Sequence, residues 1–205
     1  MKMRQINVAI ASLTHAHVRK YYQTLHDNAK LNWVAVSCSD RKIADHFMTL
    51  GFDVPVYEST EEMLEKHPEI EGVVIASENS RHFGDMELCC RYHKNMLSMK
   101  IPTFDLEEYD RMIQMVKDAD VICQVELEMH YNPTTRRALE LVQSGTIGDV
   151  ISFNATNITL SPVWAFPWQG VPEISYGRRV PLREGDHRFR GGALSDHPHI
   201  FDTLR

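Results

Sequence analysis

The sequence lacks long apolar runs, basic clusters and any apolar leader at its start. No window of 18 consecutive apolar residues occurs, which excludes a membrane-spanning helix of ordinary length. The formal net charge is −6, and the lack of a basic run argues against a nucleic acid or an anionic membrane as partner. The first residues run straight into a strand-like segment rather than the apolar region of a signal peptide.

Cysteine is scarce and shows no pairing motif. The four cysteines are Cys38, Cys89, Cys90 and Cys123, and none of them forms a C-x-x-C pair. Cys89 and Cys90 lie in a helical pattern, where adjacent side chains diverge. We therefore expect buried thiols in a reducing compartment rather than a disulfide framework, and predict a cytoplasmic protein.

What the first 130 residues do contain is a regular alternation of short apolar runs with helical patterns. A run of β-branched residues, Val73 to Ile75, is typical of a strand covered on both faces of a parallel sheet. The alternation predicts an α/β fold with a doubly wound parallel sheet over residues 1–125. The expected strands are residues 7–11, 33–37, 54–57, 72–76, 95–99 and 121–125.

The pattern changes after residue 130. Asn132-Pro133 is a typical helix start and Gly145 a typical helix end. Residues 149–160 favour a strand of a second sheet, and residues 161–192 favour loops over a site. One helix, one strand and loops bury little surface, so we interpret residues 126–205 as the first part of a truncated second domain.

The turn after the first strand has no glycine, because none occurs before Gly51. Ligands of doubly wound sheets bind at the carboxyl ends of the strands, where this turn lies. The hydroxyls of Ser12 and Thr14, with the backbone of Leu13 and His15 at the start of the next helix, could hold a phosphate. The alternative is an ordinary strand-to-helix turn.

Three further strand ends carry candidate binding residues. After the second strand, Asp40 could hold a ribose hydroxyl, Ser39 and Arg41 could hold a 2′-phosphate, or Asp40 could simply cap a helix. After the fifth strand, Lys100 could move a proton if burial lowers its pKa, or be a surface lysine. The segment after the fourth strand offers Ser77, Asn79 and His82.

The densest polar cluster lies near the end of the sequence, after Gly191-Gly192. Asp196, His197 and His199 have the residue types for a divalent metal site. They could equally exchange a proton with a substrate hydroxyl, or form a polar loop without function. The double glycine favours a close backbone approach, and therefore a site.

Three segments together resemble one family. Residues 73–82 are similar to the pattern V-V-I-A-T-P-N-x-x-H, and Tyr131-Asn132-Pro133 with residues 145–150 is similar to an F-N-P helix ending in G-x-I-G-x-V. Residues 191–202 are similar to G-G-A-L-x-D-x-G-x-H-x-x-D. These segments resemble the Gfo/Idh/MocA oxidoreductases, the glucose–fructose oxidoreductase and inositol dehydrogenase group.

The resemblance implies a Rossmann domain that binds NAD or NADP, followed by a domain with an open antiparallel sheet. It implies hydride transfer between the nicotinamide and a sugar, polyol or related alcohol or ketone, with no metal required and a homo-oligomer possible. It maps the family's proton-handling and orienting residues onto Lys100, Asp196 and His199. The residues it leads us to expect at the cofactor are Ser12, Leu13, Thr14, His15, Ser39, Asp40, Ser77, Asn79 and His82.

Several positions depart from the family pattern. The fingerprint glycines are replaced, and the E-K-P motif has Met99 and Ile101 on either side of Lys100. The Asp-to-His spacing is one residue short, so either His197 or His199 could fill the histidine role. Two rival hypotheses follow: a non-catalytic relative that binds a small ligand or partner in the same crevice, and a metal-dependent lyase or isomerase.

Overall fold

The computed structural model describes residues 4–15, 17, 18, 22, 26–49, 51 and 53–154. Asp196, His197, His199 and the predicted loops of residues 161–192 lie outside these described residues. The elements in chain order are β1 (Ile6–Ala11), β2 (Leu31–Ser37), α2 (Arg41–Met48), β3 (Val56–Tyr57), α3 (Thr60–Lys66), β4 (Gly72–Ile75), α4 (Asn79–Arg91), β5 (Asn95–Ser98), α5 (Leu106–Ala119), β6 (Cys123–Val125), the 3₁₀ helix η1 (Glu128–Tyr131) and α6 (Pro133–Gln143).

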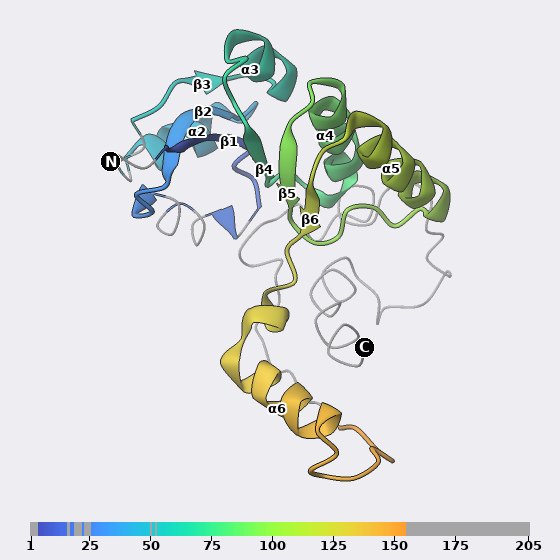
Figure 1. Cartoon of the computed structure of the whole chain (residues 1–205). Coiled ribbons are helices and arrows are strands. Elements are labelled where there is room, and N and C mark those ends of the chain that lie inside the picture. Colours follow the sequence, from blue (N-terminus) through green and yellow to red (C-terminus); the bar gives the residue numbers. More distant parts are fainter. Residues whose placement is uncertain are drawn as a thin grey trace, which may run out of the picture.

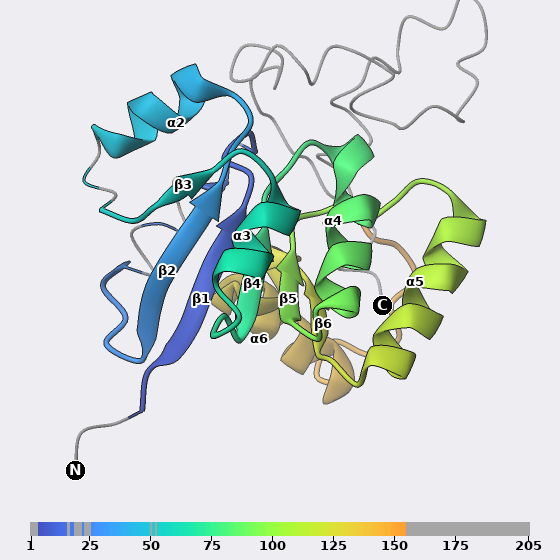
Figure 2. The same ribbon diagram turned by 90° about the horizontal axis from the view of Figure 1, so that it is seen from above.

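The six strands form one parallel sheet in the order β3-β2-β1-β4-β5-β6, which can be followed in Figure 2. The chain moves outward from β1 to β3, then returns to the other side of β1 and moves outward again to β6. The predicted doubly wound parallel sheet is therefore confirmed. Its order reverses beside β1, and the register there pairs Ala11 with both Ser37 of β2 and Ile75 of β4.

Side chains that alternate along the central strands bury both faces of the sheet. On one face, Ala9 and Ala11 of β1 meet core residues of α3, α4 and α5, among them Met63, Met86 and Met112. On the other face, Ile10 of β1 and Val74 of β4 pack with Ala44 and Phe47 of α2. Two-sided burial explains the continuous apolar runs of these strands.

Several helices begin at the capping residues that the sequence predicts. Ser59 Oγ accepts the amide of Glu62 (3.1 Å) at the start of α3, and Asp105 Oδ1 accepts the amide of Glu107 (2.9 Å) at the start of α5. Asn132 caps α6, and Gly145 follows that helix with a left-handed φ of 69°. These local signals therefore fix the orientation of the chain as it enters and leaves each helix.

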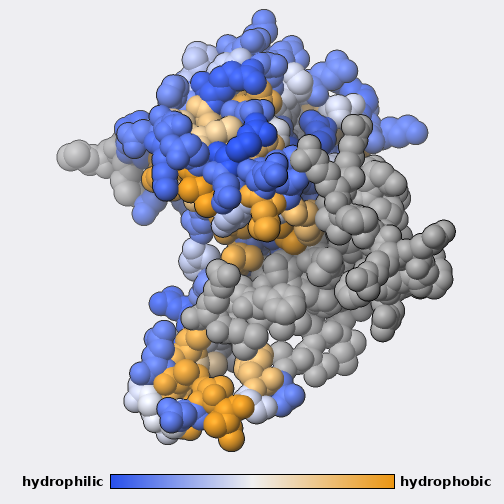
Figure 3. Space-filling model, turned by 90° about the vertical axis from the view of Figure 1, so that its right-hand side faces the viewer, coloured by the Kyte–Doolittle hydropathy of each residue, from blue (hydrophilic) through white to orange (hydrophobic). Residues whose placement is uncertain are grey.

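The chain leaves the carboxyl edge of the sheet after β6, and α6 lies beyond that edge (Figure 1). The strand expected over residues 149–160 is absent from residues 149–154, and the remaining residues lie outside the described part. A strand needs a hydrogen-bonded neighbour, and Ile151 here is 97% exposed. Figure 3 shows the apolar side chains at this end of the molecule, which include Val142, Ile147, Val150 and Phe153.

Helix α5 is less buried than its apolar stripe predicts. Met112 is buried, but Tyr109 and Ile113 are partly exposed because α5 covers the outer strands of the sheet, where the helix layer ends.

None of the helices in the described part of the chain has the length and apolar character that a membrane span requires.

Candidate functional site

The turn after β1 is built from hydroxyl groups where other turns of this kind use glycine. Ser12 adopts a left-handed φ of 69°, a conformation that costs most residues free energy and glycine almost none. Its side chain lies 3.0 Å from Thr14 Oγ1, and its Oγ accepts the amide of Thr14 at 3.4 Å. The Ser12 hydroxyl thus supports a local turn that its backbone alone would disfavour.

Several backbone amides of this turn donate hydrogen bonds to neighbouring residues of the protein. The Ser12 amide donates to Ser37 Oγ (3.2 Å), and the His15 amide donates to the Ala76 carbonyl at the end of β4 (3.0 Å). The His17 amide donates to His15 Nδ1 at 3.2 Å. These bonds fix the turn to its neighbours β2 and β4 and hold its shape before any ligand binds.

His15, His82 and Lys100 form a buried group behind this turn. The rings of His15 and His82 lie 6.2 Å apart, and Lys100 is only 5% exposed. Burial, together with the charges of His17, His82 and Lys100, lowers the pKa of His15 well below its usual value. Because His15 Nδ1 accepts an amide, the neutral ring carries its proton on Nε2.

His82 connects the ends of β4 and β5. Its Nε2 lies 2.9 Å from the Ser77 carbonyl and its Nδ1 lies 2.7 Å from the Ile101 carbonyl. Burial lowers the pKa of His82, while the two carbonyl oxygens act in the opposite direction. Because both ring nitrogens face backbone carbonyls, His82 fixes the segment that carries Lys100.

Ser77 and Asn79 lie buried at the carboxyl end of β4. Ser77 is fully buried, and its Oγ has no hydrogen-bond partner among the residues that the structure describes. Asn79 is the first residue of α4 and is also buried. An unsatisfied buried hydroxyl is costly, so Ser77 Oγ is a place where a polar ligand atom or water would be stabilised.

Asp40 caps α2, which is one of the roles the sequence left open. Its Oδ1 accepts the amides of Lys42 (2.9 Å) and Ile43 (3.2 Å). Ser39, Asp40 and Arg41 are all exposed at the carboxyl side of β2. The cap turns Asp40 Oδ1 toward the helix, Ser39 is exposed at the helix N-terminus, and Arg41 Nε lies 3.5 Å from Asp45 Oδ1 one turn along α2.

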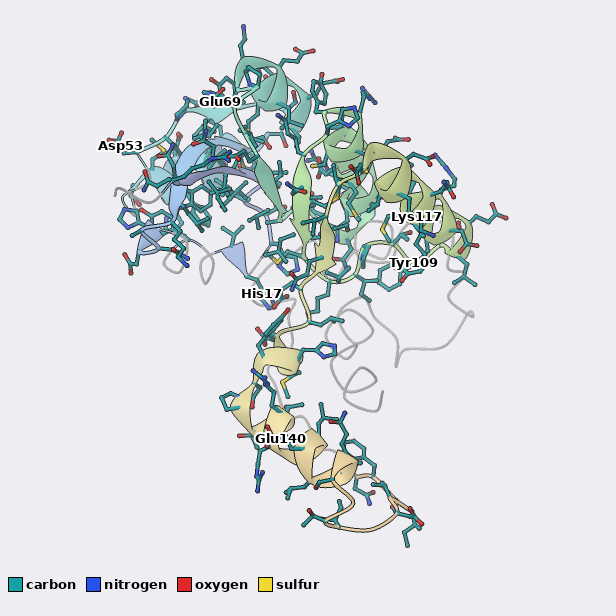
Figure 4. The ribbon with its side chains drawn as sticks, in the orientation of Figure 1. His17, Asp53, Glu69, Tyr109, Lys117 and Glu140 are labelled. Atoms are coloured by element: carbon teal, nitrogen blue, oxygen red, sulfur yellow. The ribbon has the colours of Figure 1, made fainter. Side chains whose placement is uncertain are left out.

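Two acidic residues that were not among the predicted site residues, Glu126 and Glu128, follow β6. His17 Nδ1 donates to Glu126 Oε2 at 3.3 Å, and Glu128 offers a third ligand-type atom, with all three within 4.8 Å of one another. Figure 4 places His17 beside the segment that leads from β6 to η1. Glu126 directly follows the predicted sixth strand, so the strand-end argument used for Lys100 could have found it.

These residues fit a dinucleotide along the carboxyl edge. The left-handed Ser12 gives the tight turn that glycine gives elsewhere, Ser77 Oγ offers an unused buried hydroxyl, and Lys100 brings a cation to the same edge. The sheet order reverses beside β1, the position at which doubly wound sheets bind nucleotides. Fold and edge together define a nucleotide-binding domain of the Rossmann type.

Comparison with known proteins identifies the family. The model of the oxidoreductase family with an NAD-binding Rossmann fold, the Gfo/Idh/MocA family, matches residues 6–127. The chain belongs to this family, which confirms the resemblance found in the sequence.

Two curated relatives and one solved structure illustrate the similarity. Myo-inositol 2-dehydrogenase of Thermotoga maritima is 28% identical over 92 residues, which are 45% of this chain and 27% of that protein. D-xylose 1-dehydrogenase (NADP⁺) of Hypocrea jecorina is 27% identical over 128 residues, 60% of this chain and 32% of that protein. Scyllo-inositol dehydrogenase of Lactobacillus casei, solved with NAD(H) and scyllo-inositol, is 20% identical with a TM-score of 0.65 over 71% of this chain and 43% of that one. The aligned part is less than half of each relative.

Proposed function

We propose that the protein is an NAD(P)-dependent dehydrogenase that transfers a hydride between the nicotinamide and a carbon of a sugar, polyol or related alcohol or ketone. The buried Lys100 at the carboxyl end of β5, beside His15 and behind a preformed turn, is the observation that carries this proposal. The inositol and xylose dehydrogenases among the relatives support the substrate class.

The bound dinucleotide supplies the hydride chemistry, and the protein positions it and moves a proton. Lys100 is proposed to hydrogen-bond the reacting hydroxyl and to take or give its proton, aided by a buried environment. Asp196 and His199 are proposed to complete this group from the second domain, with His197 as the alternative histidine.

The end of β2 favours NADP over NAD within this proposal. Asp40 Oδ1 accepts two amides of α2, whereas Ser39 and Arg41 are exposed at the same helix N-terminus, with Arg41 Nε 3.5 Å from Asp45 Oδ1. The first turn of α2 contains no acidic residue. A 2′-phosphate is stabilised by a guanidinium, and Arg41 supplies one at the N-terminus of α2.

We further propose that residues 1–125 form the dinucleotide domain and residues 126–205 begin the substrate domain. Helix α6 beyond the carboxyl edge, and the exposed apolar side chains after it, support a continuation of the fold on that side. The homo-oligomer suggested by the family resemblance is tested by sedimentation of the full chain.

Titration of the full chain with NADH and NADPH, followed by nicotinamide fluorescence, tests the proposed function. We expect saturable binding of both, with NADPH binding more tightly. Absence of binding of either nucleotide at millimolar concentration would contradict the proposal and favour a non-catalytic role for the crevice.

A further inference from the structure

Four buried polar residues from different parts of the fold form one hydrogen-bonded chain beneath the turn after β1. The Ser12 amide donates to Ser37 Oγ (3.2 Å), the hydroxyls of Ser37 and Thr60 lie 3.2 Å apart, and Thr60 Oγ1 donates to Asp85 Oδ1 at 2.9 Å. Each of the four residues is between 2% and 4% exposed. We refer to Ser37, Thr60 and Asp85 as the relay.

The chemistry of the groups fixes the direction of this relay. Thr60 Oγ1 donates to Asp85 Oδ1, so the single proton of the Thr60 hydroxyl is used there. Ser37 must then donate its own proton to Thr60, and a lone pair of Ser37 Oγ remains for the Ser12 amide. Every hydroxyl donates once and accepts once, so the loss of any member breaks the whole series.

Asp85, at the other end of the relay, receives a side-chain hydrogen bond from Thr60. Asp85 lies within α4, and its second carboxylate oxygen, Oδ2, is buried and accepts no hydrogen bond from any residue in the described part of the chain. Asp85 Oδ1 accepts from Thr60, the first residue of α3, and Ser37 is the last residue of β2. The relay thus joins two helices and a strand end to the turn.

Ser37, at one end of the relay, accepts the amide of Ser12, the residue of the turn with the least favourable backbone conformation. Ser12 has a left-handed φ of 69°, and its amide points to Ser37 rather than toward the edge of the sheet. The orientation of this peptide decides which hydroxyls and amides of the turn face a ligand. A glycine would reach the same conformation without support, but a serine has to be held there.

We propose that Ser37, Thr60 and Asp85 are positioning residues that hold the glycine-free turn in the conformation required to bind the pyrophosphate of the dinucleotide. The inference rests on the proposed function, since it assumes that a dinucleotide binds at this edge. The three act through the backbone of the turn rather than by contact with the ligand, because their polar groups bond to one another and to the Ser12 amide.

The test compares Thr60→Val, which removes the hydroxyl from a side chain of the same shape, with Thr60→Ser, which keeps it. NADPH affinity of the full chain is expected to fall about tenfold in Thr60→Val and to stay within about twofold of wild type in Thr60→Ser. Adenosine, which has no phosphate, is expected to bind all three proteins equally. A general loss of structure would weaken both ligands and would not be rescued by serine.

Ser37→Ala provides a second break in the same relay and keeps the test open if Thr60→Val does not fold. We expect Ser37→Ala to weaken NADPH binding to a similar degree, and the double variant to be no weaker than either single variant, because each already breaks the series. Three results would contradict this positioning role. They are additive losses of NADPH affinity in the double variant, equal losses in Thr60→Val and Thr60→Ser, and unchanged NADPH affinity in Thr60→Val.

Hydrogen exchange of the Ser12 amide separates this inference from the proposed function. If wild type binds neither NADH nor NADPH, the proposed function fails, but the relay still predicts slow exchange of this amide in wild type and Thr60→Ser and faster exchange in Thr60→Val. Equal exchange rates in the three proteins would overturn the relay by themselves.

Discussion

The two halves of the sheet's carboxyl edge are built in opposite ways. Beside β1 and β2, the polar groups of Ser12, Thr14 and Ser37 bond mainly to one another and to the backbone. Beside β4 and β5, Ser77 Oγ has no hydrogen-bond partner among the described residues, and Lys100 brings a buried charge. The first half is held in shape by its own hydrogen bonds, and the second half contains the groups that we propose to take part in the reaction.

The largest expected effect is a loss of turnover, and it is tested by comparing two buried lysines at opposite ends of β5. Lys94 precedes β5 and donates to the Pro68 carbonyl (2.7 Å), whereas Lys100 follows β5 at the carboxyl edge. Lys100→Met should lower turnover at least about a hundredfold, because the proton transfer is lost, and change the dissociation constant for NADPH far less, because the turn after β1 still holds the nucleotide. Steady-state kinetics on a panel of inositols and pentoses, with a parallel NADPH titration, measures both.

Lys94→Met is the matched control, since it removes a buried lysine at the opposite end of the same strand. It should keep its turnover, even if the protein loses some stability. Equal turnover in Lys100→Met and wild type would show that the β5 end takes no part in the reaction.

The next effect is a change in stability, which tests the half beside β1 and β2 through the backbone conformation of Ser12. Ser12→Val should lower the free energy of unfolding by about 2 kcal/mol, because a β-branched residue is strained at a φ of 69° and the bond to Thr14 is lost. Ser12→Gly should be tolerated to within about 1 kcal/mol, since glycine adopts this φ freely. Denaturant unfolding compares them, and equal stability of the two variants would contradict the strained-turn account.

A smaller effect concerns pH and the buried histidine between the two halves. The pKa of His15 is lowered in the folded protein, so below about pH 6.5 the unfolded chain takes up a proton that the folded protein does not. Stability therefore falls as the pH drops below that value, by up to about 1.4 kcal/mol per pH unit for this residue. His15→Gln should flatten the dependence of unfolding free energy on pH between 6.5 and 5, and an unchanged slope would contradict the burial argument.

The smallest effect concerns the choice of nucleotide at β2. Arg41→Ala removes the exposed guanidinium that pairs with Asp45 (3.5 Å) and is proposed to meet the 2′-phosphate, so it should weaken NADPH binding about fivefold while NADH binding stays constant. Lys42→Ala, in the next position of the same helix turn, serves as a comparison. Equal losses for NADPH and NADH in Arg41→Ala would place Arg41 away from the ribose.

Most of the fold could be predicted from the sequence because it depends on local signals. Apolar runs such as Val73–Ile75 indicate buried strands, and caps such as Asp105 and Asn132 mark helix starts. The expected strand after Asp149 could not be judged this way, because a strand also needs a neighbour that local sequence does not specify.

The site could be predicted only in part. The strand-end rule brings Lys100 and the turn at Ser12 to one edge, but it does not reveal that His82 faces two carbonyls or that Thr60 contacts Asp85. The contacts of His82 with the Ile101 carbonyl and of Thr60 with Asp85 join residues 19 and 25 positions apart through tertiary packing. No spacing pattern in the sequence encodes them.

Hydrogen–deuterium exchange of the full chain with and without saturating NADPH tests the central claim most directly. The account predicts slower exchange in the segments that follow β1, β2, β4 and β5, at residues 12–18, 38–42, 76–82 and 99–102. It predicts no change at the opposite edge of the sheet, at residues 67–71 and 93–95. Protection confined to that opposite edge, or no protection at all under saturation, would contradict the placement of the nucleotide site.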